Sequence, residues 1–496
     1  MKDKKDQASI NEKDLVIEYG RFHKKPRTRR EFLSQGAISG VGTVMVPSFL
    51  SLLSQRAMGI ECQPEVKDNG TPFIAIDLSG GANIPGGNVM VGKAGGQQDF
   101  IADYSTLSIA PSISENLSAN ITTINGGNLD SGLIFLSDSQ LLAGIKSAAQ
   151  ESTLANVDGA IFCTSSIDDT NANPHNPMYW INKAGLNGEL VPLVGTTSSP
   201  SGGRAAAPES SINPAAKPVQ MTSPGSTGSL VDLGLLANLL SVEKAEKVMK
   251  AISTMSQTQI AKFSEKSMAQ KIKDLVSCGY ISSSGLLSKY GPEALDPTKD
   301  SAIVSAFGNN FNGDNAKASA VVKLVLDGLA GAGTIELGGY DYHGSANTVK
   351  RTKDFAAGKQ IGQIFEAAAQ KNKPVVLYLF TDGGVSFAGN DEQNGRYGRG
   401  SDNSERSAAV LFAYNPKGKV KIRNSLRQIG EFNDIGAVND SINPVSNSVE
   451  LLTKLIVANY LALSGEEGKL NTIVGDNPFG SKLDSMLSFS ADTLKG

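Results

Sequence analysis

Five apolar runs constrain the fold of this chain more than any other feature of its sequence. They lie at Thr71–Gly81, Gly159–Thr164, Gly333–Leu337, Pro374–Phe380 and Ala408–Tyr414. Continuous apolar runs of this length are typical of strands that are buried on both faces. Segments of helical periodicity separate several of the runs. This alternation predicts an α/β fold, with a mostly parallel central sheet flanked by helices and the first run as a central strand.

Three of the flanking helices can be placed from apolar residues that recur every three or four positions. The segments are 318–329, 354–370 and 449–459. Each has an apolar face that a sheet would cover. The second helix and the runs beside it predict a strand, helix, strand unit from Thr334 to Thr381.

Composition changes in the middle of the chain and indicates an insertion. Residues 196–229 are mostly Ser, Pro, Gly, Thr and Ala, which predicts a low-complexity loop that is disordered or lies on the surface. Residues 230–300 are predicted to form a helical insertion, because Ala245, Val248 and Ile252 lie on one face of an amphipathic helix. Residues 60–496 are accordingly interpreted as a single α/β domain.

Residues 1–59 are predicted to be a twin-arginine signal region. Arg29-Arg30 is followed by Phe32-Leu33 and then by an 18-residue stretch, Gly36–Leu53, whose hydrophobicity Ser, Gly, Thr and Pro dilute. Such a stretch is weak as a membrane span, and Ala57-Met58-Gly59 after it resembles a cleavage site. The alternative is that the arginine pair simply starts a charged helix. The signal predicts export by the twin-arginine machinery to the periplasm, the cell surface or the exterior, with no stable membrane span after cleavage.

Charge and cysteine content argue against three features: a nucleic-acid partner, a disulfide framework and a thiolate zinc site. Residues 1–59 hold eleven Lys and Arg and six Asp and Glu, which leaves 35 and 43 in the remainder, a formal charge near −8. A nucleic-acid partner is therefore not expected, because phosphate binding needs clustered basic residues. Only three cysteines occur and none forms a CxxC pair, which argues against a disulfide framework and a thiolate zinc site.

Polar side chains next to the apolar runs are the candidates for chemistry. Asp341 and His343 follow the third run, Asp382 follows the fourth, and Asp402 precedes the fifth. Ligands of parallel sheets bind at the carboxyl ends of the strands, where carboxylates and imidazole can hold a divalent metal. The predominance of oxygen ligands favours calcium or magnesium, with zinc as the alternative. Each residue taken alone could equally serve a turn or a cap.

His175 is a separate candidate, because it precedes a predicted helix in the segment Asn171–Trp180. The free amides at the start of a helix can bind an anion. The alternative is a packed corner of Pro174, Pro177, Tyr179 and Trp180 with His175 as its polar tip.

Several of these segments resemble a bacterial family known as domain of unknown function fifteen-oh-one, which is exported by twin-arginine signals and is similar to alkaline phosphatases and sulfatases. The matching segments are Gly80-Gly81-Ala82-Asn83, Pro174-His175, Gly338-Gly339-Tyr340-Asp341-Tyr342-His343 and Ser401-Asp402-Asn403. The resemblance covers most of the chain beyond the signal and implies an alkaline-phosphatase-like core.

This chain departs from the family pattern where chemistry is expected. Asn83 replaces an acid, Pro174 a serine and Asn403 a histidine, so the resemblance implies the loss of a nucleophile and of two metal ligands. These losses favour a non-catalytic relative that serves in binding or in assembly at the cell envelope. The alternative is a metal-dependent hydrolase of phosphate or sulfate esters, with the four strand-end residues as ligands and His175 as acid, base or anion contact. A redox or dinucleotide enzyme has no motif to support it.

Overall fold

The computed structural model of the protein describes residues 70–167, 173–230, 292–344, 347–388, 398–491 and 493–494. The predicted signal region 1–59 lies outside these ranges, and so does most of the predicted helical insertion, including the amphipathic helix near Ala245.

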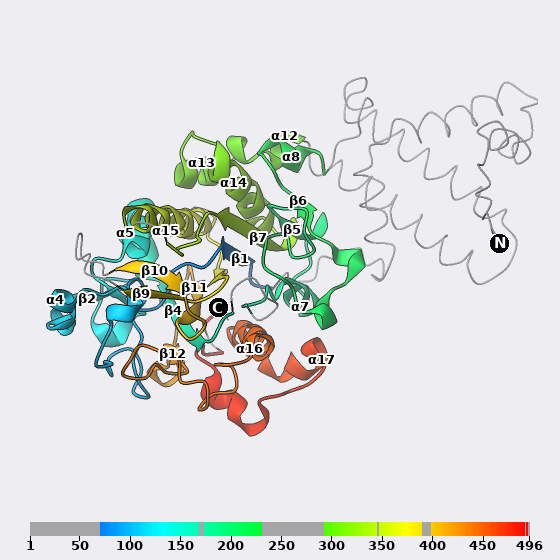
Figure 1. Cartoon of the computed structure of the whole chain (residues 1–496). Helices are drawn as coiled ribbons and strands as arrows, with labels where there is room; N and C mark the ends of the chain where they lie inside the picture. The colour runs from blue at the N-terminus through cyan, green and yellow to red at the C-terminus, as the bar shows by residue number, and fades with distance from the viewer. Residues whose placement is uncertain are drawn as a thin grey trace, which may run out of the picture.

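A mixed eight-stranded sheet forms the centre of the molecule (Figure 1). In spatial order its strands are β12 (Gln428–Ile429), β4 (Val157–Thr164), β11 (Ser407–Tyr414), β8 (Val375–Thr381), β1 (Phe73–Ser79), β7 (Ala330–Gly338), β5 (Val191–Gly195) and β6 (Val219–Gln220). All neighbours pair in parallel except β11, which is antiparallel to both β4 and β8. Two small antiparallel pairs lie outside this sheet, β2 (Ile121–Thr123) with β3 (Ile134–Leu136) and β9 (Val385–Ala388) with β10 (Arg399–Asp402).

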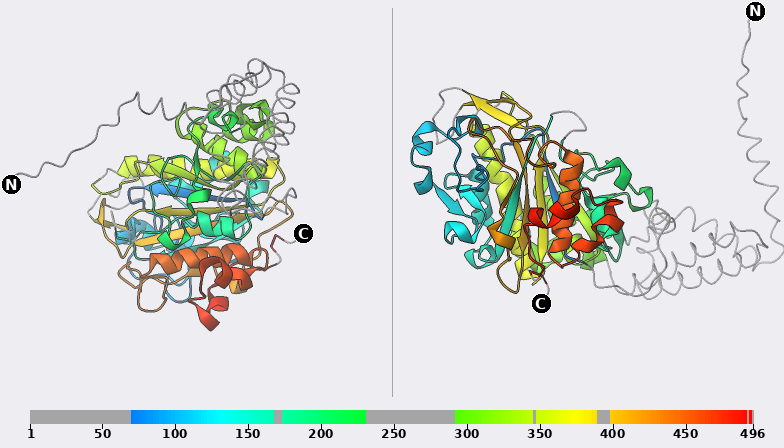
Figure 2. Two further views of the ribbon diagram at one scale, coloured as in Figure 1. Left: turned by 90° about the vertical axis from the view of Figure 1, so that its right-hand side faces the viewer. Right: turned by 90° about the horizontal axis from the view of Figure 1, so that it is seen from below.

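Helices cover both faces of the sheet, so that the domain has three layers (Figure 2). The α-helices are α4 (Pro111–Ser114), α5 (Gln140–Ala148), α6 (Glu151–Leu154), α7 (Met178–Lys183), α8 (Gly225–Gly228), α12 (Pro292–Leu295), α13 (Ser301–Phe307), α14 (Gly313–Leu326), α15 (Asn347–Gln370), α16 (Val449–Ala462) and α17 (Leu470–Val474). Single turns of 3-10 helix occur at Ser105–Leu107, Leu117–Ala119, Leu129–Ser131, Glu209–Ser211, Pro214–Ala216, Pro297–Lys299, Arg423–Ser425 and Glu467–Lys469, and a longer one at Gly480–Met486. Helices α5, α14 and α15 lie on one face and α7, α16 and α17 on the other.

The side chains of β1 alternate between two hydrophobic cores, one on each face of the sheet. Ile74, Ile76 and Leu78 belong to the core under α14 and α15, whereas Phe73 and Ala75 belong to the core under α7 and α16. Successive side chains of a strand point to opposite faces. The same alternation directs Asp77 toward the face that α7 and α16 cover.

The predicted α/β fold with a mostly parallel sheet is confirmed. The five apolar runs correspond to β1, β4, β7, β8 and β11, and β1 is central, between β8 and β7. The predicted strand, helix, strand unit exists as β7, α15 and β8, but β1 lies between its two strands. Strand β11 runs against its neighbours, which the composition of its run did not indicate.

Residues 196–229, predicted to form a low-complexity loop, follow β5 and contribute two turns of 3-10 helix, the edge strand β6 and the short helix α8. Within this segment Ser201, Ala207 and Met221 are buried. Hydrogen bonds join it to the sheet, such as that from Met221 N to Gly195 O, 2.7 Å. The segment therefore covers the ends of β1, β5 and β7.

Helices α5 and α15 approach each other through glycines. A Cβ atom at Gly358 of α15 would lie 1.9 Å from the carbonyl oxygen of Leu141, and one at Gly144 of α5 would lie 2.2 Å from that of Phe355. Contacts this short cannot be relieved by rotating a side chain, because the obstructing atoms belong to the backbone. The two helices can pack at this distance only while both positions lack side chains.

Replacing Gly358 with Ala should therefore lower the free energy of unfolding by about 1–3 kcal/mol, because the added methyl group forces the helices apart. Urea denaturation monitored by circular dichroism measures the change. Gly468→Ala is the matched control, since nothing lies within 4 Å of a Cβ at that glycine. Equal stability of the two variants would contradict the glycine-mediated packing.

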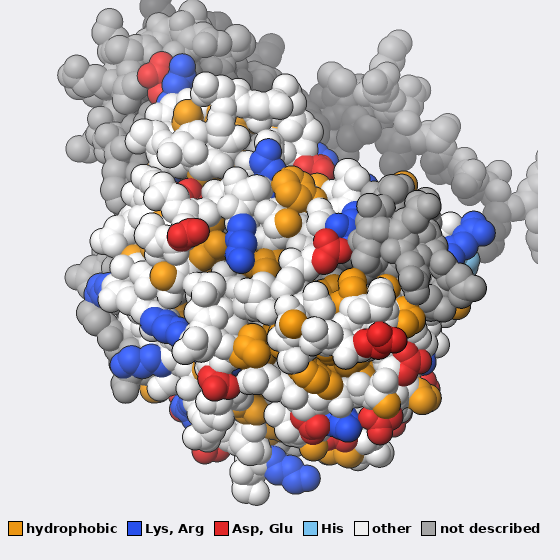
Figure 3. Space-filling model, turned by 90° about the vertical axis from the view of Figure 1, so that its left-hand side faces the viewer, with side chains coloured by type: hydrophobic (Ala, Val, Ile, Leu, Met, Phe, Trp, Pro, Cys, Tyr) orange, Lys and Arg blue, Asp and Glu red, His pale blue; other side chains and the backbone are white. Residues whose placement is uncertain are grey.

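Charges of both signs are interspersed on the face shown in Figure 3, with no extended basic area among its described residues. In the described part of the chain, no helix has the length and apolar character needed to cross a membrane.

Candidate functional site at the carboxyl edge of the sheet

The loops after β1, β7 and β8 meet at one edge of the sheet together with the segment before β11. Tyr340 N donates to Ser79 O at 3.0 Å, and Ala82 N donates to the hydroxyl of Thr381 at 2.7 Å. Asn403 N donates to Gly384 O at 2.8 Å. Because β11 is antiparallel, its first residues reach the same edge as the last residues of β1, β7 and β8. The three polar segments predicted from the sequence, which contain Asp341 and His343, Asp382, and Asp402, are thus brought together with the loop after β1.

Asp77, near the end of β1, is the buried carboxylate of this edge, with an exposed fraction of 2%. Its Oδ2 accepts hydrogen bonds from the backbone N–H groups of Arg204 (2.7 Å) and Ala205 (2.8 Å). Burial raises the pKa of Asp77 to about 6, although these two amides lower it, and the negative charges of Glu336 and Asp382 raise it further. Asp77 therefore ties the segment after β5 to the centre of the sheet.

The raised pKa of Asp77 predicts a loss of stability as pH rises. The folded protein holds this proton more tightly than the unfolded chain, so stability is greatest below the ordinary pKa of 3.8 and declines through about 6. Between about pH 5 and pH 7.5 the loss should be about 1 kcal/mol. Urea denaturation at both pH values measures it, and Asp77→Asn should remove this part of the dependence. An unchanged pH dependence in Asp77→Asn would contradict the assignment.

His343 and Asp402, two of the predicted metal ligands, pair with each other. His343 Nδ1 lies 2.6 Å from Asp402 Oδ2, and the two side chains are 60% and 42% exposed. Their contact joins the loop after β7 to strand β10. The backbone N–H of His343 also donates to Asp341 Oδ1 at 3.0 Å, so Asp341 takes part in a turn of the same loop.

Asp382, the remaining predicted ligand, follows β8 and accepts a hydrogen bond from the side chain of Asn173. It also accepts one from Gly383 N at 3.0 Å. Within the described ranges, no three side chains of His, Cys, Asp or Glu are grouped so that they could hold a metal ion. The four residues predicted as ligands share an edge of the sheet. The metal site stays a prediction.

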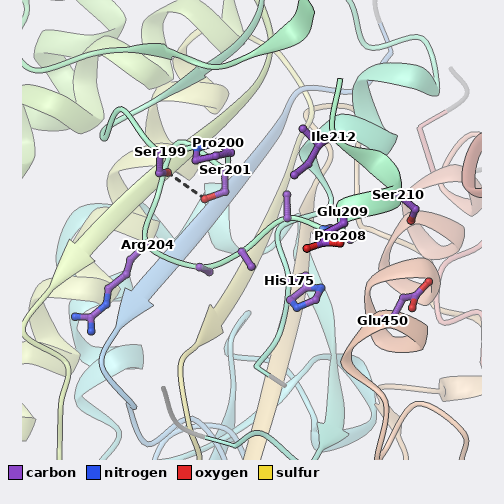
Figure 4. A pocket seen from close by; sticks show the side chains of 13 residues that line it. His175, Ser199, Pro200, Ser201, Arg204, Pro208, Glu209, Ser210, Ile212 and Glu450 are labelled. Atoms are coloured by element: carbon purple, nitrogen blue, oxygen red, sulfur yellow. Dashed lines mark hydrogen bonds between the residues drawn. The ribbon is translucent and has the colours of Figure 1, made fainter. Parts of the chain in front are cut away.

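His175 lies in the wall of a cavity of about 730 Å³ on the α16 side of the sheet (Figure 4). Most of the cavity wall comes from the segment after β5, and α16 contributes Glu450. The complete lining is His175, Ser199, Pro200, Ser201, Arg204, Ala205, Ala206, Ala207, Pro208, Glu209, Ser210, Ile212 and Glu450. The helix after His175, α7, has six residues, and Met178, Tyr179, Trp180 and Ile181 in it are buried, which agrees with the packed-corner interpretation.

Hydrogen bonds to the backbone hold the wall of the cavity in place. Asn176 N donates to Ala206 O at 2.9 Å, and the Asn176 side chain donates to Ser201 O at 3.1 Å and to the Thr334 hydroxyl at 2.7 Å. A Cβ at Gly203 would lie 2.7 Å from Asp77 Oδ2, so only glycine allows the chain to pass this close to the carboxylate. The backbone that forms the cavity wall is therefore fixed by hydrogen bonds with Asp77 and Asn176.

Sequence reasoning missed Arg204, Glu209 and Glu450 as candidate residues. Arg204 and Glu209 lie in the stretch that composition assigned to a surface loop, and Glu450 is in the first turn of α16. One signal was available: Arg204 is the only charged residue between Glu189 and Glu209. An isolated arginine in a small, polar segment indicates a role that composition alone does not explain.

The fold and site together define an α/β protein with a polar cavity beside the carboxyl edge of its sheet. Comparison of the chain with protein-family models, with curated proteins and with solved structures finds no match.

Proposed function

We propose that this chain is an exported binding protein that holds a small ligand without hydrolysing it. The observation that carries the proposal is the cavity of about 730 Å³, whose wall is held by hydrogen bonds to Asp77 and from Asn176. The cavity is lined mainly by hydroxyl groups, small side chains and a few charges. Concave sites of this size with few polar groups are typical of small-ligand binding.

The proposed place of work is the cell envelope or the exterior, which the Arg29-Arg30 motif and the apolar stretch after it support. The proposed ancestry is a degenerate member of the alkaline phosphatase and sulfatase superfamily. Its support is the order of the sheet, in which Asp341 and His343 follow β7 and Asp382 follows β8 at a common edge.

A second candidate is the metal-dependent ester hydrolase, which Asp77 favours. This buried carboxylate lies beside Glu336 in the register of β1 and β7 and is influenced by the charge of Asp382. Carboxylates with strongly raised pKa values occur often at catalytic sites. A hydrolase would use these carboxylates together with the predicted ligands Asp341, His343, Asp382 and Asp402.

Two measurements on purified full-length protein distinguish the candidates. The first is turnover of aryl phosphate and aryl sulfate esters with added calcium, magnesium or zinc. The binding protein should show none, whereas turnover that Asp77→Asn or His343→Ala abolishes would overturn the proposal.

The second measurement is a thermal-shift screen with a library of small polar molecules. The binding protein should be stabilised by at least one compound. Ala206→Trp is the control: Ala206 is an exposed residue of the cavity wall, so the indole should fill the cavity and remove the shift. A shift that persists in Ala206→Trp would place the ligand elsewhere and contradict the proposed site.

A further inference from the structure

Four exposed lysines lie at the edge of the sheet where β1, β4 and β8 begin and β11 ends, opposite the carboxyl edge. These edge lysines are Lys373, Lys417, Lys419 and Lys421. The first precedes β8 and the other three follow β11. Tyr414 at the end of β11 pairs with Val375 at the start of β8, so the register brings both groups to the same edge.

The segment that carries three of the edge lysines is held against the C-terminal tail. Asn415 Nδ2 donates to Thr493 O at 2.8 Å, and Lys421 N donates to Thr493 Oγ1 at 3.2 Å, so the segment stays near the end of β11. Val420 is buried, whereas Lys419 and Lys421 on either side of it are exposed. Because successive side chains of an extended segment point in opposite directions, these two lysines face solvent on the same side.

Neighbouring acids do not compensate the charge of the edge lysines. The chain beyond residue 59 is acidic overall, yet residues 417–427 contain five Lys and Arg and no Asp or Glu. Arg423 and Arg427 in this segment pair with carboxylates. Within the described part of the chain, the four edge lysines form no ion pair. Their positive charge is therefore available to a partner.

The chain enters the domain at the same edge. Pro72 O accepts a hydrogen bond from Val376 N of β8 at 2.8 Å, and Thr71 O accepts one from Tyr460 Oη at 2.8 Å. The predicted signal region 1–59, with its apolar stretch, lies upstream of these residues in the sequence. The edge that carries the lysines is therefore also the edge from which the chain leads back to the segment predicted to meet a membrane.

We propose that the edge lysines bind the anionic phospholipid surface of a membrane. Ammonium groups spread along an edge can contact several phosphates of a flat surface at once. Each lysine near such a surface contributes a factor of about five to the affinity, and salt screens the attraction. The proposal goes beyond the ligand-binding function and does not depend on it. Because the cavity lies beside the carboxyl edge, a domain held in this way keeps the cavity open to solvent.

Co-sedimentation of the full chain with vesicles of phosphatidylcholine, with and without phosphatidylglycerol, tests the proposal. The wild type should prefer the anionic vesicles, and added salt should weaken its binding. Replacing all four edge lysines with Gln should lower the affinity at least about 10-fold. Lys419→Gln with Lys421→Gln should also weaken binding. Its matched control is Lys146→Gln with Lys359→Gln, which removes two exposed lysines from α5 and α15 and should leave the affinity unchanged.

A second measurement reports on the edge lysines directly, because the predicted signal region is itself basic. Acetylation of exposed amines in the wild type is followed by mass spectrometry with and without anionic vesicles. The vesicles should slow acetylation of the edge lysines and leave Lys146 and Lys359 unaffected.

Three results would overturn the proposal. The first is equal protection of the edge lysines and of Lys146 and Lys359. The second is an equal affinity of the edge variant and its matched control for anionic vesicles. The third is tighter binding to a DNA duplex or to polyglutamate than to the anionic vesicles at the same salt concentration, which would identify a different class of acidic partner. A failed thermal-shift screen would count against the ligand cavity alone.

Discussion

Replacing Arg427 with Met is expected to reduce the free energy of unfolding by about 3–5 kcal/mol, because it leaves a buried carboxylate without its counter-charge. Asp158, the second residue of β4, is fully buried, and Arg427 donates to it through Nε (3.1 Å) and Nη2 (2.9 Å). Asp158 Oδ1 also accepts from the amides of Leu133 (3.0 Å) and Gly159 (2.8 Å). Urea denaturation measures the loss.

Two further variants separate the buried charge from other effects of the mutation. Arg423→Met removes ion pairs with Glu467 and Asp484, which lie closer to the surface, and should cost only about 1 kcal/mol or less. The double variant Asp158→Asn with Arg427→Met leaves no buried carboxylate without a counter-charge, so it should be more stable than Arg427→Met alone. A loss below about 1 kcal/mol for Arg427→Met would contradict the role assigned to this pair.

Asp300→Ala is expected to lower the free energy of unfolding by about 2–4 kcal/mol, because the Asp300 carboxylate both caps a helix and takes part in an ion-pair network. Asp300 caps α13 by accepting from Ala302 N (3.0 Å) and Ile303 N (3.2 Å). Its Oδ2 pairs with Lys323 of α14 (2.7 Å) and with Lys371, which follows α15 (2.6 Å). The substitution therefore loosens the contacts among three helices on one face of the sheet.

The pH dependence of stability provides an independent test of the same carboxylate. Burial raises the pKa of Asp300, but hydrogen bonds from Lys323 and Lys371 outweigh it and lower the pKa to about 2. The stabilisation, about 2 kcal/mol, is present above the ordinary pKa of 3.8 and is lost as pH falls through about 2. Acid titration of unfolding should show this loss in the wild type and not in Asp300→Ala.

Asp327→Asn is the matched control for Asp300. Asp327 pairs with the same two lysines but caps no α13 amide, and its side chain is 24% exposed compared with 11% for Asp300. Asp327→Asn should therefore lower the free energy of unfolding by less than Asp300→Ala does. Equal losses in the two variants would show that the cap on α13 contributes nothing.

Much of the fold could be predicted from local sequence because the central strands are buried on both faces. Such strands are continuous apolar runs, which is why β1, β4, β7, β8 and β11 were all recognisable. Short edge strands carry no such signal: β6 and β12 have two residues each in the sheet. The antiparallel direction of β11 could not be predicted either, because an apolar run does not indicate whether a strand is parallel or antiparallel to its neighbours.

The site was predicted only in part. The rule that polar residues gather at the carboxyl ends of strands placed Asp341, His343, Asp382 and Asp402 at one edge. It could not indicate that His343 would contact Asp402 or that Asp382 would accept a hydrogen bond from Asn173. The residues of the first pair are 59 positions apart in the chain, and those of the second are 209 positions apart. The cavity was missed because Ser- and Gly-rich composition suggests a loop whether or not that loop packs against a sheet.

The sequence by itself determined the five central strands and the helices α14, α15 and α16, since periodicity and apolar runs act over a few residues. Only the tertiary structure decided which side chains meet. The insertion of β1 between β7 and β8 positions Asp77 beside Glu336, and the chain after β5 crosses the sheet to donate two amides to Asp77. That crossing forms the wall of the cavity and separates Arg204 from Glu450. Such contacts depend on the order of strands in space, which is settled by packing of the whole core and leaves no local trace in the sequence.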